Sequence, residues 1–261
     1  MKNMFIRCGA LLSAALFWAM SCVAQPASSD TYLASLREPM NARWPLNRTV
    51  NIVFHGHSVP AGYARTPVVA TLDAYPYQTL VTIKKYYPNA VVNTITTAIG
   101  GEDAEQGSAR FTSEVLTHRP DVVFIDYALN DRKLGLERAE KGWRKMIEEA
   151  LQAGVKVVLC TPTPDLSARM TSPDDPLTQH AEMIRRLAAE YHVGLADIYA
   201  EFVAMIGRGA RIADYMSQSN HPNAAGHQVA VSVIAKWILT PEQFADYSAP
   251  AGSNLNSTAS D

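Results

Sequence analysis

Short apolar runs alternate along the chain with longer stretches in which apolar positions recur at helical spacing. The short runs predict strands at residues 49–55, 90–96, 121–126, 155–160 and 193–198. The longer stretches predict helices at residues 77–87, 103–117, 136–153, 177–191 and 223–238. Such alternation favours right-handed βαβ units, because parallel strands need a crossover between them. The sequence therefore predicts an α/β fold, a three-layer α/β/α sandwich around a parallel sheet of about five strands.

The N-terminal residues have the order of charged, apolar and small residues that is typical of a secretory signal peptide. Lys2 and Arg7 precede an apolar stretch over residues 10–20, and small residues follow up to Ala24. The pattern predicts cleavage after Ala24 and export to the periplasm or the extracellular space. A second interpretation makes Cys22 the lipid-modified first residue of a lipoprotein. The apolar stretch is too short for a membrane span, so we expect no transmembrane segment in the mature chain.

The sequence predicts a single domain with irregular ends. We expect residues 1–24 to be the signal peptide, residues 25–45 a polar and irregular leader, and residues 46–245 the domain. Residues 246–261 are rich in small and polar residues, which predicts a disordered tail. Hydrophobic residues make up 48% of the chain, enough for a sizeable core. The formal net charge of −2 and the lack of basic clusters argue against a nucleic acid partner.

Residues with catalytic potential follow three of the predicted strands and precede the last helix. Ser58 follows the first strand, Gly101 the second and Asn130 the third, while His221 stands just before the last helix. Because the carboxyl ends of parallel strands meet at one edge of a sheet, we expect these residues to lie close together. A serine hydroxyl becomes a good nucleophile when a histidine takes its proton. Ser58 and His221 are therefore the candidate nucleophile and base.

The same group of residues offers donors for a negatively charged oxygen. An attacked ester carbonyl develops that charge and needs donors already aimed at it. The backbone N–H groups of Ser58 and Gly101 and the side-chain amide of Asn130 can supply three such donors. Glycine at position 101 allows the backbone to approach a ligand closely. These residues are the candidate oxyanion hole.

Taken together, the motifs resemble those of the SGNH hydrolases, also called GDSL-like esterases and lipases. The resemblance covers residues 50–237, and its four blocks are His55–Ser58, Ile99–Gly101, Ala128–Asp131 and Asn220–Asn223. It implies a flavodoxin-like sheet of order 2-1-3-4-5 and ester hydrolysis through an acyl-serine, with no cofactor. It also implies that Ser58 is the nucleophile, that His221 is the base, and that Ser58, Gly101 and Asn130 form the oxyanion hole.

Three positions depart from the family pattern. His57 replaces the aspartate that usually precedes the nucleophile, and Ala128 replaces a glycine. The third departure matters more, because Gln218 occupies the position of the triad acid, three residues before His221. A glutamine can orient an imidazole but does not stabilise imidazolium as a carboxylate does. Another acid such as Asp214, a backbone carbonyl group, or a Ser–His dyad without a third member are the alternatives.

These observations predict an exported serine esterase that acts on small acyl esters, with O-acetyl groups on carbohydrate as the expected substrate. Aryl esters, lysophospholipids and thioesters are further candidate substrates. Gln218 and His57 motivate an alternative, a carbohydrate-binding protein on a hydrolase scaffold that has lost activity. A metal-dependent hydrolase is a third possibility, because His55 and His57 would point to one side of a strand. No third ligand follows at a convincing spacing, so we predict no metal site.

Overall fold

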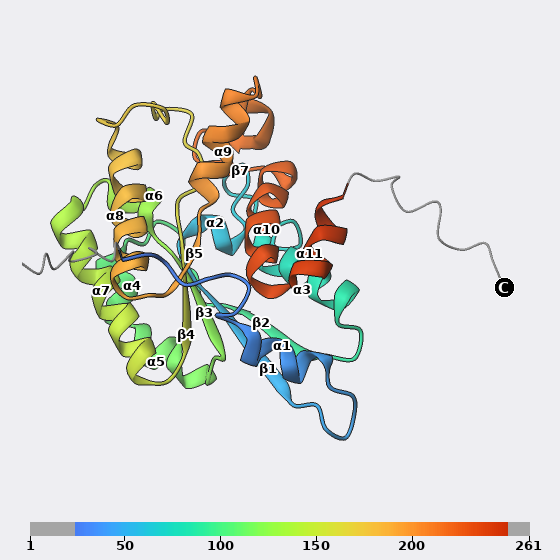
Figure 1. Ribbon diagram of the computed structural model, residues 1–261. Helices are drawn as coiled ribbons and strands as arrows, with labels where there is room; N and C mark the ends of the chain where they lie inside the picture. The colour runs from blue at the N-terminus through green and yellow to red at the C-terminus, as the bar shows by residue number, and fades with distance from the viewer. Residues whose placement is uncertain (1–23, 250–261) are drawn as a thin grey trace, which may run out of the picture.

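The computed structural model of the chain describes residues 24–249 and contains a five-stranded parallel sheet (Figure 1). The strand order is β2-β1-β3-β4-β5, which confirms the predicted α/β fold and its 2-1-3-4-5 order. The strands of this sheet are β1 (Thr49–Gly56), β2 (Val91–Thr96), β3 (Val122–Asp126), β4 (Lys156–Cys160) and β5 (Gly194–Ala196). A separate antiparallel pair consists of β6 (Met216–Gln218) and β7 (His221–Pro222).

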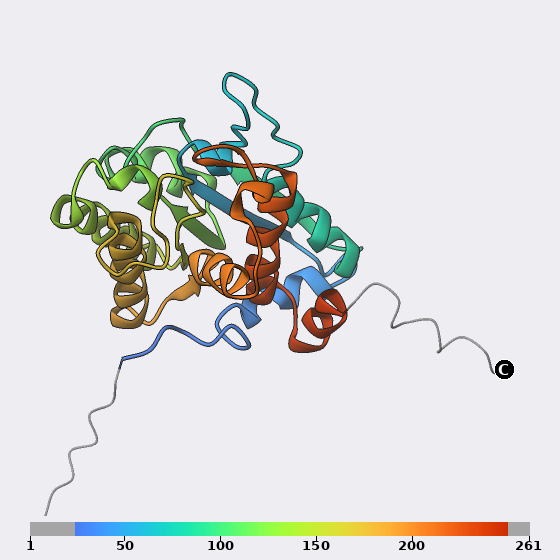
Figure 2. The ribbon, with the colours of Figure 1, turned by 90° about the horizontal axis from the view of Figure 1, so that it is seen from above.

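Helices cover both faces of the parallel sheet, as Figures 1 and 2 show from two directions. Along the chain they are α1 (Ala34–Asn41), α2 (Ser58–Ala61), α3 (Tyr75–Tyr86), α4 (Ala104–Ala109), α5 (Phe111–Glu114), α6 (Ala128–Asp131), α7 (Leu136–Gln152), α8 (Pro176–Glu190), α9 (Ile198–Gly207), α10 (Ala224–Ile238) and α11 (Pro241–Ser248). Two short 3₁₀ helices lie at Leu116–His118 and Ile212–Tyr215.

The core is divided by the sheet into two buried clusters. Phe54 and Phe124 stack on one face, together with side chains of α1, α3, α9 and α10. Val53 and Val123 face the other side, where α4, α5 and α7 contribute buried residues, and α8 supplies side chains to both clusters. Neighbouring strand residues thus point to opposite faces, as the pleat of a strand requires. This explains why the strands read as continuous apolar runs.

The prediction of an irregular leader over residues 25–45 is wrong for α1 (Ala34–Asn41). This helix buries Leu36 and Met40, and it contacts β1. Its Arg37 side chain is also buried and donates to two carbonyl groups at the end of α10, over 2.9 and 3.2 Å. The buried arginine is satisfied by these hydrogen bonds, which tie α1 to the domain. The domain therefore includes part of the predicted leader.

The predicted helix over residues 103–117 is also wrong in its continuity. The chain forms α4, α5 and a 3₁₀ turn instead. Arg110 separates α4 from α5 with φ −107° and ψ 4°, and its side chain reaches back to the carboxylate of Glu102. The predicted helix is therefore interrupted at the residue whose side chain binds Glu102.

The ends of the predicted domain change in two ways. The structure contains a further helix after the last predicted one, α11, which ends at Ser248, three residues past the predicted end of the domain at 245 and within the predicted tail. Residues 1–23 of the predicted signal peptide and residues 250–261 of the predicted tail lie outside the described residues.

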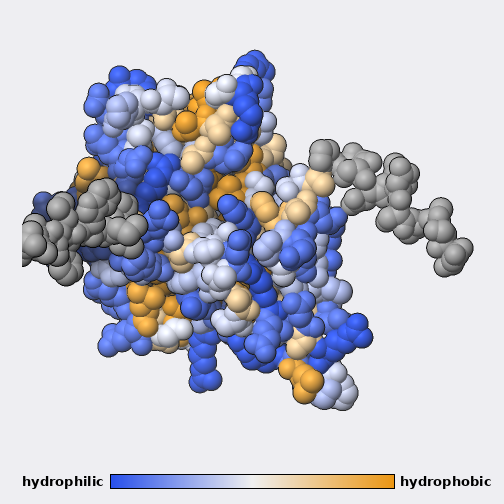
Figure 3. All heavy atoms as spheres, in the orientation of Figure 1, coloured by the Kyte–Doolittle hydropathy of each residue, from blue (hydrophilic) through white to orange (hydrophobic). Residues whose placement is uncertain are grey.

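Within residues 24–249, no helix is long and apolar enough to cross a membrane. On the face shown in Figure 3, apolar residues form small separate patches in a hydrophilic surface.

Candidate active site

Ser58 lies two residues after the end of β1, at the first residue of the short helix α2. Gly56 ends the strand where a Cβ atom would lie 2.4 Å from the backbone oxygen of Asp126 on β3, so only glycine fits there. His57 caps α2, because its Nδ1 accepts from the backbone N–H of Val59 over 3.1 Å. Gly62 ends the helix in the left-handed region with φ 93°. Ser58 is thus held in a tight turn at the carboxyl end of the central strands.

The structure brings Ser58 and His221 together, as the sequence predicts. The Nε2 atom of His221 lies 2.9 Å from the Oγ atom of Ser58. His221 belongs to β7, and Asn223 directly afterwards caps α10 by accepting from the backbone N–H of Gly226 over 3.0 Å. The strand and the helix cap therefore fix the backbone on both sides of the imidazole.

A backbone carbonyl group orients His221, which answers the question that the sequence leaves open. The Nδ1 atom of His221 lies 2.9 Å from the carbonyl oxygen of Ala64. A carbonyl oxygen only accepts hydrogen bonds, so Nδ1 carries the proton and Nε2 is free to accept from Ser58. Asp214 is not the partner, because its carboxylate pairs with Arg211 at 2.8 Å. Gln218 does not face the ring either, since its Oε1 accepts from the backbone of Thr66.

The surroundings of His221 favour the neutral imidazole. Burial lowers the pKa of His221 below its ordinary value of 6.5, and the nearby His57 ring acts in the same direction. The hydrogen bond to the Ala64 carbonyl raises the pKa but does not outweigh burial. A neutral imidazole is the form that can take the proton of Ser58.

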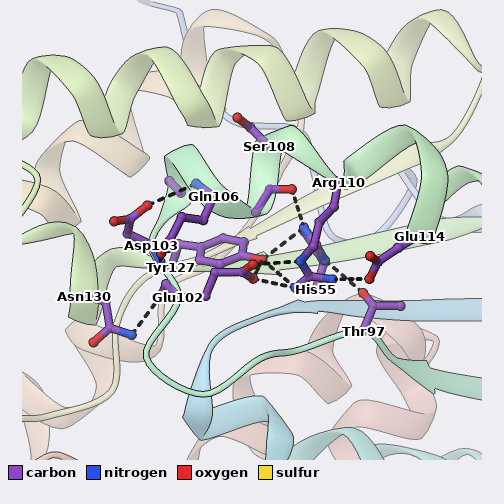
Figure 4. Close-up of polar contacts among 12 residues, drawn as sticks. His55, Thr97, Glu102, Asp103, Gln106, Ser108, Arg110, Glu114, Tyr127 and Asn130 are labelled. Carbon is purple, nitrogen blue, oxygen red and sulfur yellow. Dashed lines mark hydrogen bonds and ion pairs between the residues drawn. The ribbon is translucent and has the colours of Figure 1, made fainter.

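Gly101 and Asn130 follow the two strands that flank β1, because β1 lies between β2 and β3. Gly101 follows β2 with φ 83°, and a Cβ atom there would meet no atom within 4 Å. Asn130 lies in α6, directly after β3, and its Nδ2 donates to the carbonyl oxygen of Glu102 over 2.9 Å (Figure 4). The amide of Asn130 thus holds the loop that carries Gly101 and keeps a second N–H for a ligand.

A buried polar network anchors the loop after Gly101, and the sequence analysis missed it. The carboxylate of Glu102 accepts from Arg110 Nε over 2.8 Å and from the Tyr127 hydroxyl over 2.9 Å (Figure 4). The Tyr127 oxygen also lies 3.0 Å from Nε2 of His55. The network joins the loop to β1 and to the end of β3. A charged residue directly after the candidate oxyanion glycine was the one available sequence signal.

His55 and His57 have structural partners rather than a common ligand. The Nδ1 atom of His55 lies 2.8 Å from Thr97 Oγ1, and burial lowers the pKa of His55 to about 3. The Nε2 atom of His57 faces a carboxylate oxygen of Asp126 at 3.4 Å, and both side chains are buried. Within residues 24–249, no three His, Cys, Asp or Glu side chains are grouped so that they could hold a metal ion.

The comparisons with known proteins agree with this fold and with the motifs. The GDSL-like Lipase/Acylhydrolase family matches residues 54–229, which include Ser58, Gly101, Asn130 and His221. A comparison with curated protein sequences finds no match. The chain belongs to the GDSL-like lipase/acylhydrolase family, that is, to the SGNH class of serine ester hydrolases.

Solved structures of esterases share the fold. A catalytic mutant of an acetylxylan esterase from Geobacillus stearothermophilus is 20% identical, with a TM-score of 0.62. The similarity covers 72% of this chain and 94% of that one. A two-domain esterase active on acetylated mannans is 22% identical, with a TM-score of 0.65. That similarity covers 91% of this chain and 58% of the longer two-domain protein. At these identities the likeness concerns the fold.

Proposed function

We propose that this protein is an exported serine esterase that hydrolyses small acyl esters, with O-acetyl groups on carbohydrate as its substrates. The observation that carries the proposal is the 2.9 Å contact between Ser58 Oγ and His221 Nε2, with the Ala64 carbonyl on the other ring nitrogen. This geometry holds the tautomer that a general base requires. It also supports an esterase over the alternative of an inactive binding protein, which the missing acid at Gln218 suggested.

The proposed reaction uses the residues of the site in two steps. His221 Nε2 takes the proton of Ser58 while Oγ attacks the ester carbonyl carbon, and the N–H donors at Ser58, Gly101 and Asn130 stabilise the oxyanion. The tetrahedral intermediate expels the alcohol, which takes the proton from His221. Water then attacks the acyl-serine with His221 as base, so that the acid leaves and Ser58 recovers its proton.

The choice of substrate rests on the structural relatives and on the sequence. The two similar proteins are named for activity on acetylated xylan and acetylated mannan. Export of this chain, with cleavage after Ala24, would place it where such polymers occur. The proposal of export rests on the N-terminal pattern alone. The mass of the mature protein tests it, since a lipid on Cys22 would give a different mass from a chain beginning at Gln25.

Acetate release is the measurement that tests the substrate class. We expect the protein to release acetate from p-nitrophenyl acetate and from acetylated xylan or mannan. The aryl ester reports whether the acyl-serine chemistry occurs, because its leaving group needs little specific binding. Release from the aryl ester but from neither polysaccharide would contradict the carbohydrate assignment and leave an esterase of another specificity. No release from any of these esters would favour the binding protein.

The esterase activity is expected to persist at mildly acidic pH. Only the neutral imidazole of His221 accepts the proton of Ser58, and a lowered pKa keeps that form populated as the pH falls. The acid midpoint of kcat/KM is therefore expected below 6.5. Initial rates with p-nitrophenyl acetate from about pH 4 to pH 8 check this. A midpoint at or above 6.5 would show that a negative charge, absent from the proposed arrangement, stabilises the imidazolium.

A further inference from the structure

The loop of residues 62–74, between α2 and α3, carries the carbonyl group that orients His221. Figure 2 shows this loop extending from the body of the protein. Its base is closed by hydrogen bonds from Tyr63 N to Ser58 O, at 3.0 Å, and from Ala70 N to Gly62 O, at 2.7 Å. Its outer part is exposed, and Val68 retains 58% of its accessible surface. The backbone N–H of Ala64 also donates to the carbonyl oxygen of Val68 over 3.0 Å, so hydrogen bonds at the base and within the loop hold the backbone at Ala64.

Gln218 connects this loop to the strand pair that carries His221. The residue lies on β6 and pairs with His221 across the antiparallel register. Its Oε1 accepts from the backbone N–H of Thr66 over 3.0 Å, two residues beyond Ala64. Its Nε2 donates to Asn220 Oδ1 over 3.1 Å. One side chain therefore links the two segments whose atoms meet at Nδ1 of the imidazole.

The side chain at this position uses both functions of an amide. It accepts from one backbone N–H and donates to one side-chain oxygen. An aspartate or glutamate carboxylate can accept but has no proton to donate when it is ionised. The glutamine therefore fits a linking role that an ionised acid fills only in part. These two hydrogen bonds give a physical reason for a glutamine at the position where the family usually has an acid.

We propose that Gln218 is a positioning residue, which holds the Ala64 carbonyl against Nδ1 of His221 through the backbone of Thr66. The proposal rests on the function proposed above. The triad then consists of Ser58, His221 and a backbone carbonyl group, and Gln218 acts at the position of the family's acid without touching the ring. The orientation of the imidazole depends on the backbone at Ala64, and the Gln218 side chain supplies the contact that joins this part of the loop to β6.

Replacing Gln218 by alanine tests the proposal on kinetics. Gln218→Ala is expected to lower kcat for p-nitrophenyl acetate by about 10- to 100-fold, by analogy with the loss of a group that orients a metal-ligating histidine. KM should change little, because the side chain does not face the reacting atoms. Gln218→Glu keeps an acceptor for Thr66 and is expected to recover most of kcat. Arg65→Ala, an exposed change on the same loop, serves as the control and should leave kcat unchanged.

The tautomer of His221 provides a readout that needs no turnover. The ¹⁵N chemical shifts of the imidazole distinguish a protonated ring nitrogen from an unprotonated one. We expect one tautomer, protonated at Nδ1, in the parent protein and a mixture in Gln218→Ala. A folded Gln218→Ala protein that keeps a single Nδ1–H tautomer and full kcat would overturn the proposal. An inactive parent protein would contradict the proposed function, and the tautomer would still decide whether Gln218 positions the ring.

Discussion

Ser58→Ala is expected to reduce hydrolysis of p-nitrophenyl acetate to the background rate, a loss on the order of 10⁶-fold in kcat if nucleophile and base act as a unit. The substitution removes the one oxygen that faces His221 Nε2 and leaves the Cβ atom in place. The acyl-serine then has no atom on which to form. Initial rates at saturating substrate measure the effect directly, and the urea unfolding midpoint shows whether the fold is retained.

Ser232→Ala is the matched control for this experiment. Its hydroxyl donates to the backbone oxygen of Val229 within α10 and belongs to no part of the proposed site. The control variant should keep the parent rate. Residual activity in Ser58→Ala within tenfold of the parent would mean that another group attacks the ester, and the assignment of Ser58 as nucleophile would then fail.

The parallel sheet and the residues at its edge could be predicted because each leaves a local pattern. A buried parallel strand appears as a continuous apolar run, because both of its faces are covered. In β1, Phe54 packs into the cluster on one face of the sheet and Val53 into the cluster on the other. The edge residues follow from topology, because consecutive βαβ units place the carboxyl ends of the strands together. The contact between Ser58 and His221 joins residues far apart in sequence, and it follows once the order of the elements is known.

The partner of His221 could not be predicted because a backbone carbonyl group carries no sequence signal. Every residue has one, and only the course of the loop after Gly62 brings that of Ala64 to the imidazole. The sequence at Gln218 showed that the usual acid was missing but not what replaced it. Only the geometry of the loop shows that the Ala64 carbonyl group replaces the acid. A missing motif residue is therefore weak evidence for lost activity when the backbone can take its part.

Two errors in the predicted fold have a related cause. Residues 34–41 contain Pro39 and charged side chains, so their weak apolar pattern indicated an irregular segment, although α1 packs on the domain. The helix expected over residues 103–117 breaks at Arg110, whose side chain is bound to Glu102. In both segments an arginine makes contacts outside its own helix, Arg37 with the end of α10 and Arg110 with Glu102 and Tyr127. Such partners are invisible to periodicity.

Asn130→Ala is expected to lower kcat by about 10²- to 10³-fold with a small effect on KM. An oxyanion donor bonds more strongly to the charged transition state than to the neutral ester, so its loss appears in kcat. The amide of Asn130 already donates one N–H to the Glu102 carbonyl over 2.9 Å, which fixes its direction before substrate binds. Rates over a range of p-nitrophenyl acetate concentrations separate kcat from KM.

The proposed oxyanion role of Asn130 can be separated from its contact with the loop by variants of its surroundings. Tyr127→Phe removes a hydroxyl that donates to the Glu102 carboxylate over 2.9 Å, and it leaves the Asn130 amide in place. If Asn130 acts only by holding the loop, Tyr127→Phe should lower kcat by a comparable factor. If it donates to the oxyanion, Asn130→Ala should cost far more. Asn93→Ala changes an exposed residue of β2 and serves as the control. If Asn130→Ala raises KM and leaves kcat unchanged, Asn130 binds the substrate and is not an oxyanion donor.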